Sequence, residues 1–227
     1  MEKGKQIYEG KAKVLFETED PNQIIIHFKD DATAFNGVKK SSIQNKGILN
    51  TAITTYIYNY LKKQWIPTHF IKNLSDTDQL CERVEIIPLE VIIRNVVAGS
   101  LSKRLQIEEG TKIDRPIFEL CYKNDELGDP MINDDHALAM KLCTVEELET
   151  IRELTMKINK ALIELFDKMN IVLIDFKIVV LTVLNVFTMK DIYEAKDESM
   201  MGKSNEEIAA KSVEIVVNKA RSKDISL

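Results

Sequence analysis

The segment "PLEVIIRNVVAGSLSKRL" (residues 88–105) decides the fold, because it predicts a strand that leads directly into a helix. Successive side chains of a strand point to opposite faces, so Glu90, Ile92 and Arg94 share one face and the intervening apolar residues share the other. Burying charges is costly unless they are paired or bind a ligand. The strand therefore predicts either a ligand site or an internal ion pair between Glu90 and Arg94.

The same segment predicts a short helix that starts after Gly99, with Ser100 in its first turn and Arg104 one turn further on. The free amide groups at a helix N-terminus form a natural site for anions. The alternative is an ordinary capped helix without a ligand.

A second charged strand is predicted in "IVLIDFKIVVLTVLNVFTMK" (residues 171–190), where Asp175, Lys177 and Val179 share one face. Lys177 can supply positive charge where anionic groups meet, and Asp175 can orient it or hold a metal-bound water. The alternative is a buried structural ion pair.

Two further segments are candidate sites. "YEGKAK" (residues 8–13) predicts a strand that turns at Gly10 and projects Lys11 and Lys13 toward a polyphosphate. Surface lysines of an edge strand are the alternative. "YKNDELGDPMIND" (residues 122–134) predicts an oxygen-rich loop that suits Mg²⁺, or else an ordinary solvated loop.

The remaining pattern mixes strands and helices. Antiparallel strands are predicted over the first thirty residues, followed by a loop over residues 30–40 and an amphipathic helix over residues 46–64. A long helix is predicted to begin at a capping box formed by Thr144 and Glu147, and another capping box at Ser204 and Glu207 predicts a last helix.

Composition narrows the class of protein. The chain has 227 residues, 44% of them hydrophobic, and a net charge of -5, which argues against a nucleic-acid-binding protein. Three scattered cysteines do not form a disulfide framework or a zinc motif. No leader or apolar run of membrane-spanning length is present, so we expect a cytoplasmic protein that binds no membrane.

Taken together, these segments resemble the phosphoribosylaminoimidazole-succinocarboxamide synthase (SAICAR synthetase) family. The matching motifs are "YEGKAK", "DDATAFNG.KK", "LSDTDQL", "IPLEVIIRNVVAGSLSKRL.IEEG", "P.FE..YKND.LGDP.IN.DH" and "LIDFK". They occur in order over about residues 7–178, and the long central motif makes the series highly specific.

The resemblance implies an α+β fold, with an N-terminal antiparallel β lobe over residues 1–85 and a larger mixed α/β lobe over residues 86–227 that ends in a helix. A nucleotide cleft would lie between the lobes. It also implies an ATP-dependent carbon–nitrogen ligase of purine biosynthesis. Such an enzyme joins carboxyaminoimidazole ribonucleotide to L-aspartate, uses ATP and Mg²⁺, and assembles as a homo-oligomer.

The resemblance also assigns roles to individual residues of this chain. Catalytic roles fall to Asp175 and Lys177, and metal-binding roles to Glu90, Asp129 and Asp191. Arg94, Ser100 and Arg104 would bind the imidazole ribonucleotide. The nucleotide-binding residues would be Lys11, Ala12, Lys13, Val84, Ile86 and Lys123.

The motif changes after Lys177. The family continues with Leu/Ile-Glu-Phe-Gly, whereas residues 178–181 here are Ile-Val-Val-Leu. Val179 stands where a carboxylate would help to hold magnesium, and methyl groups cannot ligate a hard cation. Two expectations follow: an active ligase, or an impaired or non-catalytic nucleotide-binding homologue. The tail itself is either a genuine variant or the product of an altered reading frame or recombination.

Overall fold

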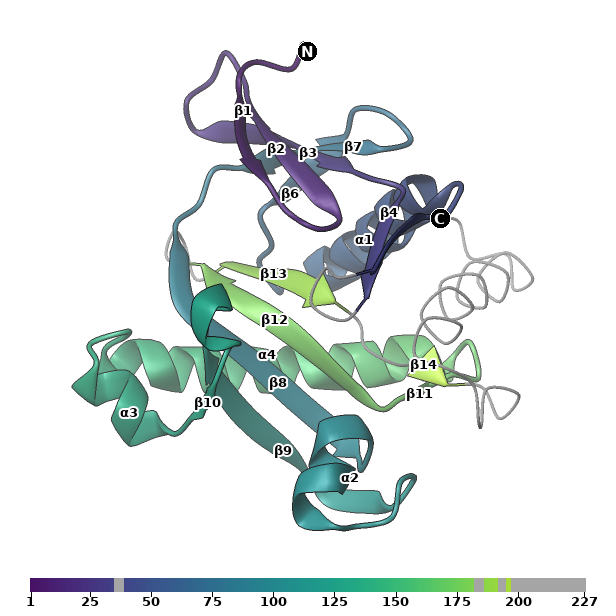
Figure 1. The fold of residues 1–227 in the computed structure, drawn as a ribbon. Coiled ribbons are helices and arrows are strands. Elements are labelled where there is room, and N and C mark those ends of the chain that lie inside the picture. Colours follow the sequence, from purple (N-terminus) through teal and green to yellow (C-terminus); the bar gives the residue numbers. More distant parts are fainter. Residues whose placement is uncertain (35–38, 182–185, 192–194, 197–227) are drawn as a thin grey trace. The chain divides into compact units, whose positions relative to one another are not determined.

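The computed structural model describes residues 1–34, 39–181, 186–191 and 195–196 (Figure 1). It divides into two compact units, and each is described by itself. The described part of the first unit is Met1–Lys63 with Thr68–Val84, and that of the second is Gln64–Pro67 with residues 85–196. The helix predicted after Ser204 lies outside the described residues.

The first unit is built on an antiparallel sheet with strand order β1-β2-β3-β7-β6. Its strands are β1 (Gln6–Glu9), β2 (Lys13–Glu17), β3 (Gln23–Phe28), β7 (Asp78–Glu82) and β6 (Phe70–Asn73). Helix α1 (Lys46–Lys63) contacts β3 and β6, and buries Ile57, Tyr58 and Leu61. The predicted antiparallel strands and the helix over residues 46–64 are confirmed.

The start of α1 is fixed by an acidic residue from the end of β3. Asp30 accepts hydrogen bonds from the amides of Gly47, at 2.8 Å, and Asn45, at 3.3 Å. A Cβ at Gly47 would lie 2.5 Å from the carbonyl oxygen of Phe28, so only glycine fits there without a shift of the backbone. The carboxylate satisfies amide groups that a helix start leaves free.

The second unit holds an antiparallel sheet with strand order β10-β9-β8-β12-β13. Its strands are β10 (Met131–Ile132), β9 (Lys112–Tyr122), β8 (Ile86–Val96), β12 (Asp175–Leu181) and β13 (Val186–Asp191). Helix α4 (Val145–Asp167) crosses one face of this sheet (Figure 1). Asn95 of β8 and Asn159 of α4 exchange two hydrogen bonds of 2.9 Å, which tie the helix to the strand.

The capping box predicted at the start of α4 is confirmed. Thr144 Oγ1 accepts from the amide of Glu147 at 3.2 Å, and the Thr144 amide donates to Glu147 Oε2 at 2.8 Å. The short elements of this unit are α2 (Gly99–Leu105), the 3-10 helix η1 (Asp125–Leu127) and α3 (Asp134–Ala139). A small two-stranded sheet pairs β11 (Val172–Leu173) with β14 (Ala195–Lys196).

Three predictions of secondary structure were wrong in detail. The loop expected over residues 30–40 contains β4 (Asp31–Ala34), which pairs with β5 (Lys39–Ser42). The sequence did not indicate this hairpin, because backbone hydrogen bonds hold it and no alternating apolar pattern marks its strands. The run "LCERVEIIPLEVIIRNVV" (residues 80–97) has strand signals throughout, but residues 83–85 lie outside any strand, between β7 and β8. The single strand expected over residues 171–190 is divided into β11, β12 and β13.

The α+β fold class is confirmed by the two antiparallel sheets and their helices. Within the described ranges, none of the helices has the length and apolar character that crossing a membrane requires.

Candidate active site

One face of the second unit's sheet carries the charges that the sequence placed on alternate positions. The β8–β12 register sets Asp175 opposite Arg94, Lys177 opposite Ile92, and Val179 opposite Glu90. Residues that face each other across a ladder share a face of the sheet. The two charged strands predicted from the sequence are therefore neighbours, and their charges meet on a surface that we call the charged face.

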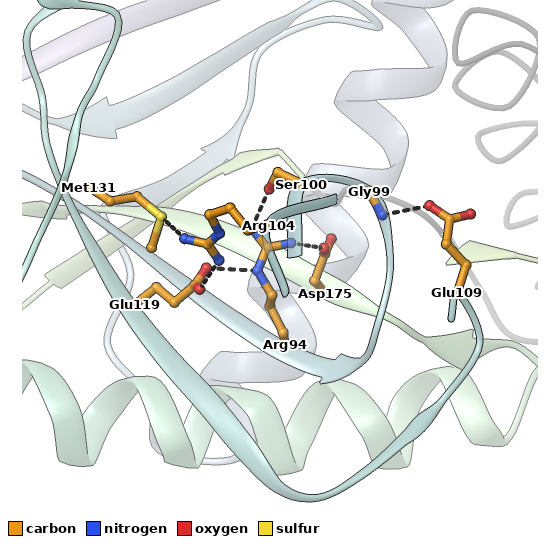
Figure 2. Close-up of polar contacts among 8 residues, drawn as sticks. All are labelled: Arg94, Gly99, Ser100, Arg104, Glu109, Glu119, Met131 and Asp175. Carbon is orange, nitrogen blue, oxygen red and sulfur yellow. Dashed lines mark hydrogen bonds and ion pairs between the residues drawn. The ribbon is translucent and has the colours of Figure 1, made fainter. Parts of the chain in front are cut away.

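Arg94 is the centre of this face (Figure 2). Its Nε donates to Glu119 Oε2 at 2.7 Å, its Nη1 to Asp175 Oδ2 at 3.0 Å, and its Nη2 to Ser100 Oγ at 2.9 Å. The side chains of Arg94, Glu119 and Asp175 are 7%, 8% and 11% exposed, so the ion pairs are largely shielded from water. The guanidinium is held in one orientation by three different partners.

Arg104 joins the same network from helix α2. Its Nη2 donates to Glu119 Oε1, and its Nη1 contacts the sulfur of Met131 (Figure 2). The Arg104 side chain is 37% exposed, and a guanidinium has more N–H groups than these two contacts use. Glu119 thus uses one carboxylate oxygen for each arginine.

The start of α2 differs from the anion site that its sequence suggested. Gly99 has a positive φ of 53°, and its amide donates to Glu109 Oε1 at 2.8 Å. A carboxylate of the chain itself therefore binds the first amide of this seven-residue helix. Ser100 contributes through its hydroxyl group, which accepts from Arg94.

A second ion pair lies on the same face. Lys177 Nζ donates to Glu90 Oε2 at 2.6 Å, and the Glu90 side chain is fully buried while that of Lys177 is 19% exposed. Glu90 and Arg94, one possible pair in the sequence, each bond to a residue on a neighbouring strand. The ion pair between Lys177 and Glu90 therefore joins the side chains of β12 and β8.

Cys121 reports on the electrostatics of this region. Burial raises the pKa of its thiol, and the negative charges of Glu90, Glu119 and Asp129 raise it further, while Lys177 lowers it. The thiol stays protonated at neutral pH, because a raised pKa disfavours the thiolate.

The loop after β9 positions Lys123 and Asp129. The Lys123 amide donates to the Pro88 carbonyl at 2.9 Å, and Asp129 Oδ1 accepts from the Asn124 amide at 2.9 Å. Asp129 itself has a positive φ of 50°. The predicted loop is confirmed and lies beside the start of β8, although it includes the short elements η1 and β10.

The first unit presents the two lysines of the "YEGKAK" motif at the turn between β1 and β2. The Gly10 amide donates to the Lys13 carbonyl at 2.8 Å, and the Ala12 carbonyl accepts from the Lys29 amide at 2.9 Å. Lys11 is exposed in the turn, whereas Lys13 begins β2 with its ammonium 5.1 Å from the centre of the Phe28 ring. Only Lys13 of the pair thus belongs to the strand.

The structure brings together most of the residues that the sequence singled out in the second unit. It also adds Glu119, to which sequence reasoning gave no role. Glu119 is the single charged residue in the run Ile117–Tyr122, which is otherwise apolar apart from the tyrosine hydroxyl. An isolated carboxylate in such a run was the available signal.

Of the residues expected to bind the metal, the structure describes the side chains of Glu90 and Asp129 but not that of Asp191. In the described ranges, no group of three or more histidine, cysteine, aspartate or glutamate side chains is arranged to hold a metal ion. Asp191 pairs with Lys177 through the backbone of β13, and its side chain lies outside the described part of the chain. Val179 is buried on the same strand as Lys177.

Comparison with known proteins identifies the family. The family model for SAICAR synthetase matches residues 6–182. The chain belongs to the SAICAR synthetase family. A phosphoribosylaminoimidazole-succinocarboxamide synthase of Fusobacterium nucleatum is 61% identical over 178 residues, which are 78% of this chain and 75% of the relative. One from Clostridium botulinum (strain Alaska E43) is 57% identical, over 78% of this chain and 76% of the relative.

Solved structures of SAICAR synthetases have the same fold. The enzyme from Ehrlichia chaffeensis superposes with a TM-score of 0.85 at 39% identity, covering 96% of this chain and 98% of that protein. A SAICAR synthetase in complex with ADP has a TM-score of 0.80 at 35% identity, covering 93% and 97%. The family membership and the fold expected from the sequence motifs are both confirmed.

Proposed function

We propose that this chain is an ATP-dependent carbon–nitrogen ligase of purine biosynthesis. It joins the carboxylate of carboxyaminoimidazole ribonucleotide to the amino group of L-aspartate, and gives SAICAR, ADP and phosphate. Relatives that are up to 61% identical carry the name of this synthase. The observation that carries the proposal is the convergence of Arg94, Arg104 and Lys177 with buried carboxylates on one face of the sheet.

The ribonucleotide is the substrate for which the arginines of the charged face are suited. Guanidinium groups bind phosphate through paired donors, and the side chain of Arg104, at 37% exposed, is the more open of the two arginines. Arg94, Ser100 and Arg104 therefore bind the ribonucleotide, including its phosphate. The three side chains are joined directly or through Glu119, which supports a common ligand.

ATP is the proposed ligand of the motif in the first unit. Lys11 and Lys13 hold the phosphates, with Ala12 between them in the turn. Lys123 reaches the nucleotide, and Val84 and Ile86 line the adenine ring. The ADP complex of a related SAICAR synthetase supports nucleotide binding by this fold.

Mg²⁺ is the proposed metal, and the donor types fit it. Magnesium binds hard oxygens and takes one or two protein carboxylates together with substrate phosphates and waters. Glu90 lies on β8, and Asp129 lies in the loop after β9 whose Lys123 amide bonds to the Pro88 carbonyl near the start of β8. Glu90, Asp129 and Asp191 would hold the ion. When bound, it neutralises negative charge on the phosphates.

The proposed reaction has two steps. An oxygen of the ribonucleotide carboxylate attacks the γ-phosphorus of ATP, and the bond from that phosphorus to the ADP oxygen breaks. The aspartate amine then attacks the acyl carbon, the carbon–oxygen bond to phosphate breaks, and the amine loses a proton. Lys177 stabilises negative charge at the reacting centre, and Asp175 fixes Arg94 beside it.

The family resemblance also supports a proposal for where the protein works and how it assembles. We propose that the protein works in the cytoplasm as a homo-oligomer on small-molecule substrates. Size-exclusion chromatography with light scattering measures the oligomeric state, and a monomer at micromolar concentration would contradict this part of the proposal.

A coupled assay for ADP release tests the function. ADP should form only when both carboxyaminoimidazole ribonucleotide and L-aspartate are present with ATP and Mg²⁺, and SAICAR should accumulate in equal amount. Omitting either substrate is the control. Retained ATP binding without turnover would contradict the proposal and favour the non-catalytic homologue.

A further inference from the structure

Glu119 has a geometry that no role in the reaction explains. Its two carboxylate oxygens accept from different arginines, Oε2 from Arg94 Nε at 2.7 Å and Oε1 from Arg104 Nη2 (Figure 2). These arginines come from different elements, β8 and α2, and Glu119 comes from a third, β9. One side chain therefore sets the distance between two guanidinium groups.

Glu119 is buried, and the two arginines that it bonds differ in how firmly the rest of the structure holds them. The side chain is 8% exposed, so its charge depends on the two arginines for compensation. Arg94 is 7% exposed and also bonded to Asp175 and Ser100, whereas Arg104 is 37% exposed. Arg94 is thus the fixed end of the bridge, and Arg104, which also contacts the sulfur of Met131, is the end that Glu119 holds through a charged hydrogen bond.

We propose that Glu119 is a positioning residue that holds Arg104 at a fixed distance from Arg94, so that both meet one phosphorylated ligand. The inference rests on the proposed function, in which these arginines bind the ribonucleotide. Glu119 does not touch the substrate. It removes the side-chain freedom that Arg104 would otherwise lose on binding, and a ligand site that is already ordered binds more tightly.

A double-mutant cycle with Glu119→Gln and Arg104→Ala tests the proposal. The side-chain amide that replaces the carboxylate has one acceptor oxygen in place of two, so it cannot accept from both arginines in the same way, and Arg104 is the one released. Glu119→Gln should raise the KM for the ribonucleotide roughly tenfold, the effect of losing a charged hydrogen bond. The KM for ATP should change by less than about twofold, because the loss concerns one ligand.

The double variant decides the mechanism. If Glu119 acts through Arg104, adding Glu119→Gln to Arg104→Ala should leave the ribonucleotide KM about where Arg104→Ala alone puts it. If Glu119 affects the ligand independently of Arg104, the fold-changes of the two single variants multiply in the double variant, and the proposal is overturned. Asp114→Asn is the matched control, an exposed carboxylate on the same strand that should change neither KM.

A readout that is independent of turnover separates this proposal from the proposed function. The Nε–H resonances of Arg94 and Arg104, assigned by arginine substitution, should shift in Glu119→Gln and stay in place in Asp114→Asn. Unchanged resonances overturn the positioning role even in an active enzyme. If the wild type makes no ADP with ribonucleotide and aspartate, the proposed function fails while the spectra still decide on the bridge. Glu119→Asp, which keeps the charge on a shorter side chain, serves where Glu119→Gln does not fold.

Discussion

The two faces of the sheet in the second unit use the same strands in opposite ways. The face toward α4 is lined by fully buried apolar residues, among them Val91, Ile93, Phe176 and Ile178. The charged face buries Glu90, Arg94 and Asp175 on the alternate positions. Neighbours along one strand therefore experience an apolar core on one side and an ion-pair network on the other.

The difference in energy between these faces indicates what each is for. Burying one large apolar side chain stabilises the fold by about 1.5 to 3 kcal/mol. A buried ion pair contributes little net stability, because desolvation of the charges offsets their attraction. The apolar face thus stabilises the unit, whereas the charged face is explained better by ligand binding than by stability.

The largest effect is expected from truncation on the apolar face. Phe176→Ala should lower the free energy of unfolding by about 3 to 5 kcal/mol, because it removes a fully buried ring and leaves a cavity. Activity per folded molecule should remain close to that of the wild type. Urea unfolding and ADP release measure the two quantities. A large fall in ADP release per folded molecule would contradict the assignment of the apolar face to stability and the charged face to ligand binding.

A substitution of the neighbouring residue Lys177, on the charged face, should reduce turnover and leave stability nearly unchanged. Lys177→Arg keeps a positive charge next to Glu90 but changes the shape and reach of the group. We expect turnover to fall by about 100-fold, as displacement of a reacting group by an ångström can cause. The midpoint of urea unfolding should move little. Unchanged turnover would remove Lys177 from the reacting centre.

Sequence reasoning located the charged strands because alternation needs only one strand at a time. The faces of Glu90, Arg94, Asp175 and Lys177 followed from period two. Their pairing did not, because the register that sets Asp175 opposite Arg94 depends on contacts between strands 81 residues apart. The alternation of side chains along one strand shows which residues share a face, whereas their ion-pair partners are known only from the folded sheet.

Glu119 and the β4–β5 hairpin were missed for two different physical reasons. Glu119 lies on a third strand, so its role depends both on the register of β8 with β9 and on where helix α2 places Arg104. The hairpin of Asp31–Ala34 with Lys39–Ser42 is held by backbone hydrogen bonds, which leave no side-chain pattern to read. The capping box of α4 succeeded because Thr144 and Glu147 interact locally.

A smaller effect is expected where an apolar residue lies on the charged face. Val179 is buried and pairs with Glu90, so Val179→Glu should set two carboxylates side by side. Relative to Val179→Gln, we expect a stability loss of about 2 kcal/mol without a cation, from repulsion between like charges. Mg²⁺ should restore it. Melting temperatures with and without Mg²⁺ measure this, and equal values for both variants would contradict the placement of a metal on this face.

A pH-dependent effect concerns His69, a buried ionisable group whose Nδ1 has no hydrogen-bond partner among the described residues. His69 in the first unit packs against Tyr58 with ring centroids 5.4 Å apart, and burial, aided by the charge of Lys13, lowers the pKa of its ring to about 3. The unfolded state then binds the extra proton between the ordinary histidine pKa and the folded value, so stability is complete above about pH 6.5 and falls as the pH decreases toward 3. The loss should be about 1.4 kcal/mol for each pH unit in that window.

His69→Leu isolates this term, because carboxylates titrate in the same range in both proteins and cancel in the difference. Urea unfolding at pH 7 and pH 5 should show wild-type stability falling more steeply than that of the variant. Parallel curves would mean that the buried ring can take up a proton at little cost. A buried site near the like charge of Lys13 would then tolerate a protonated ring as well as the ion-paired face tolerates its charges, and the contrast between paired and unpaired burial would not hold for this molecule.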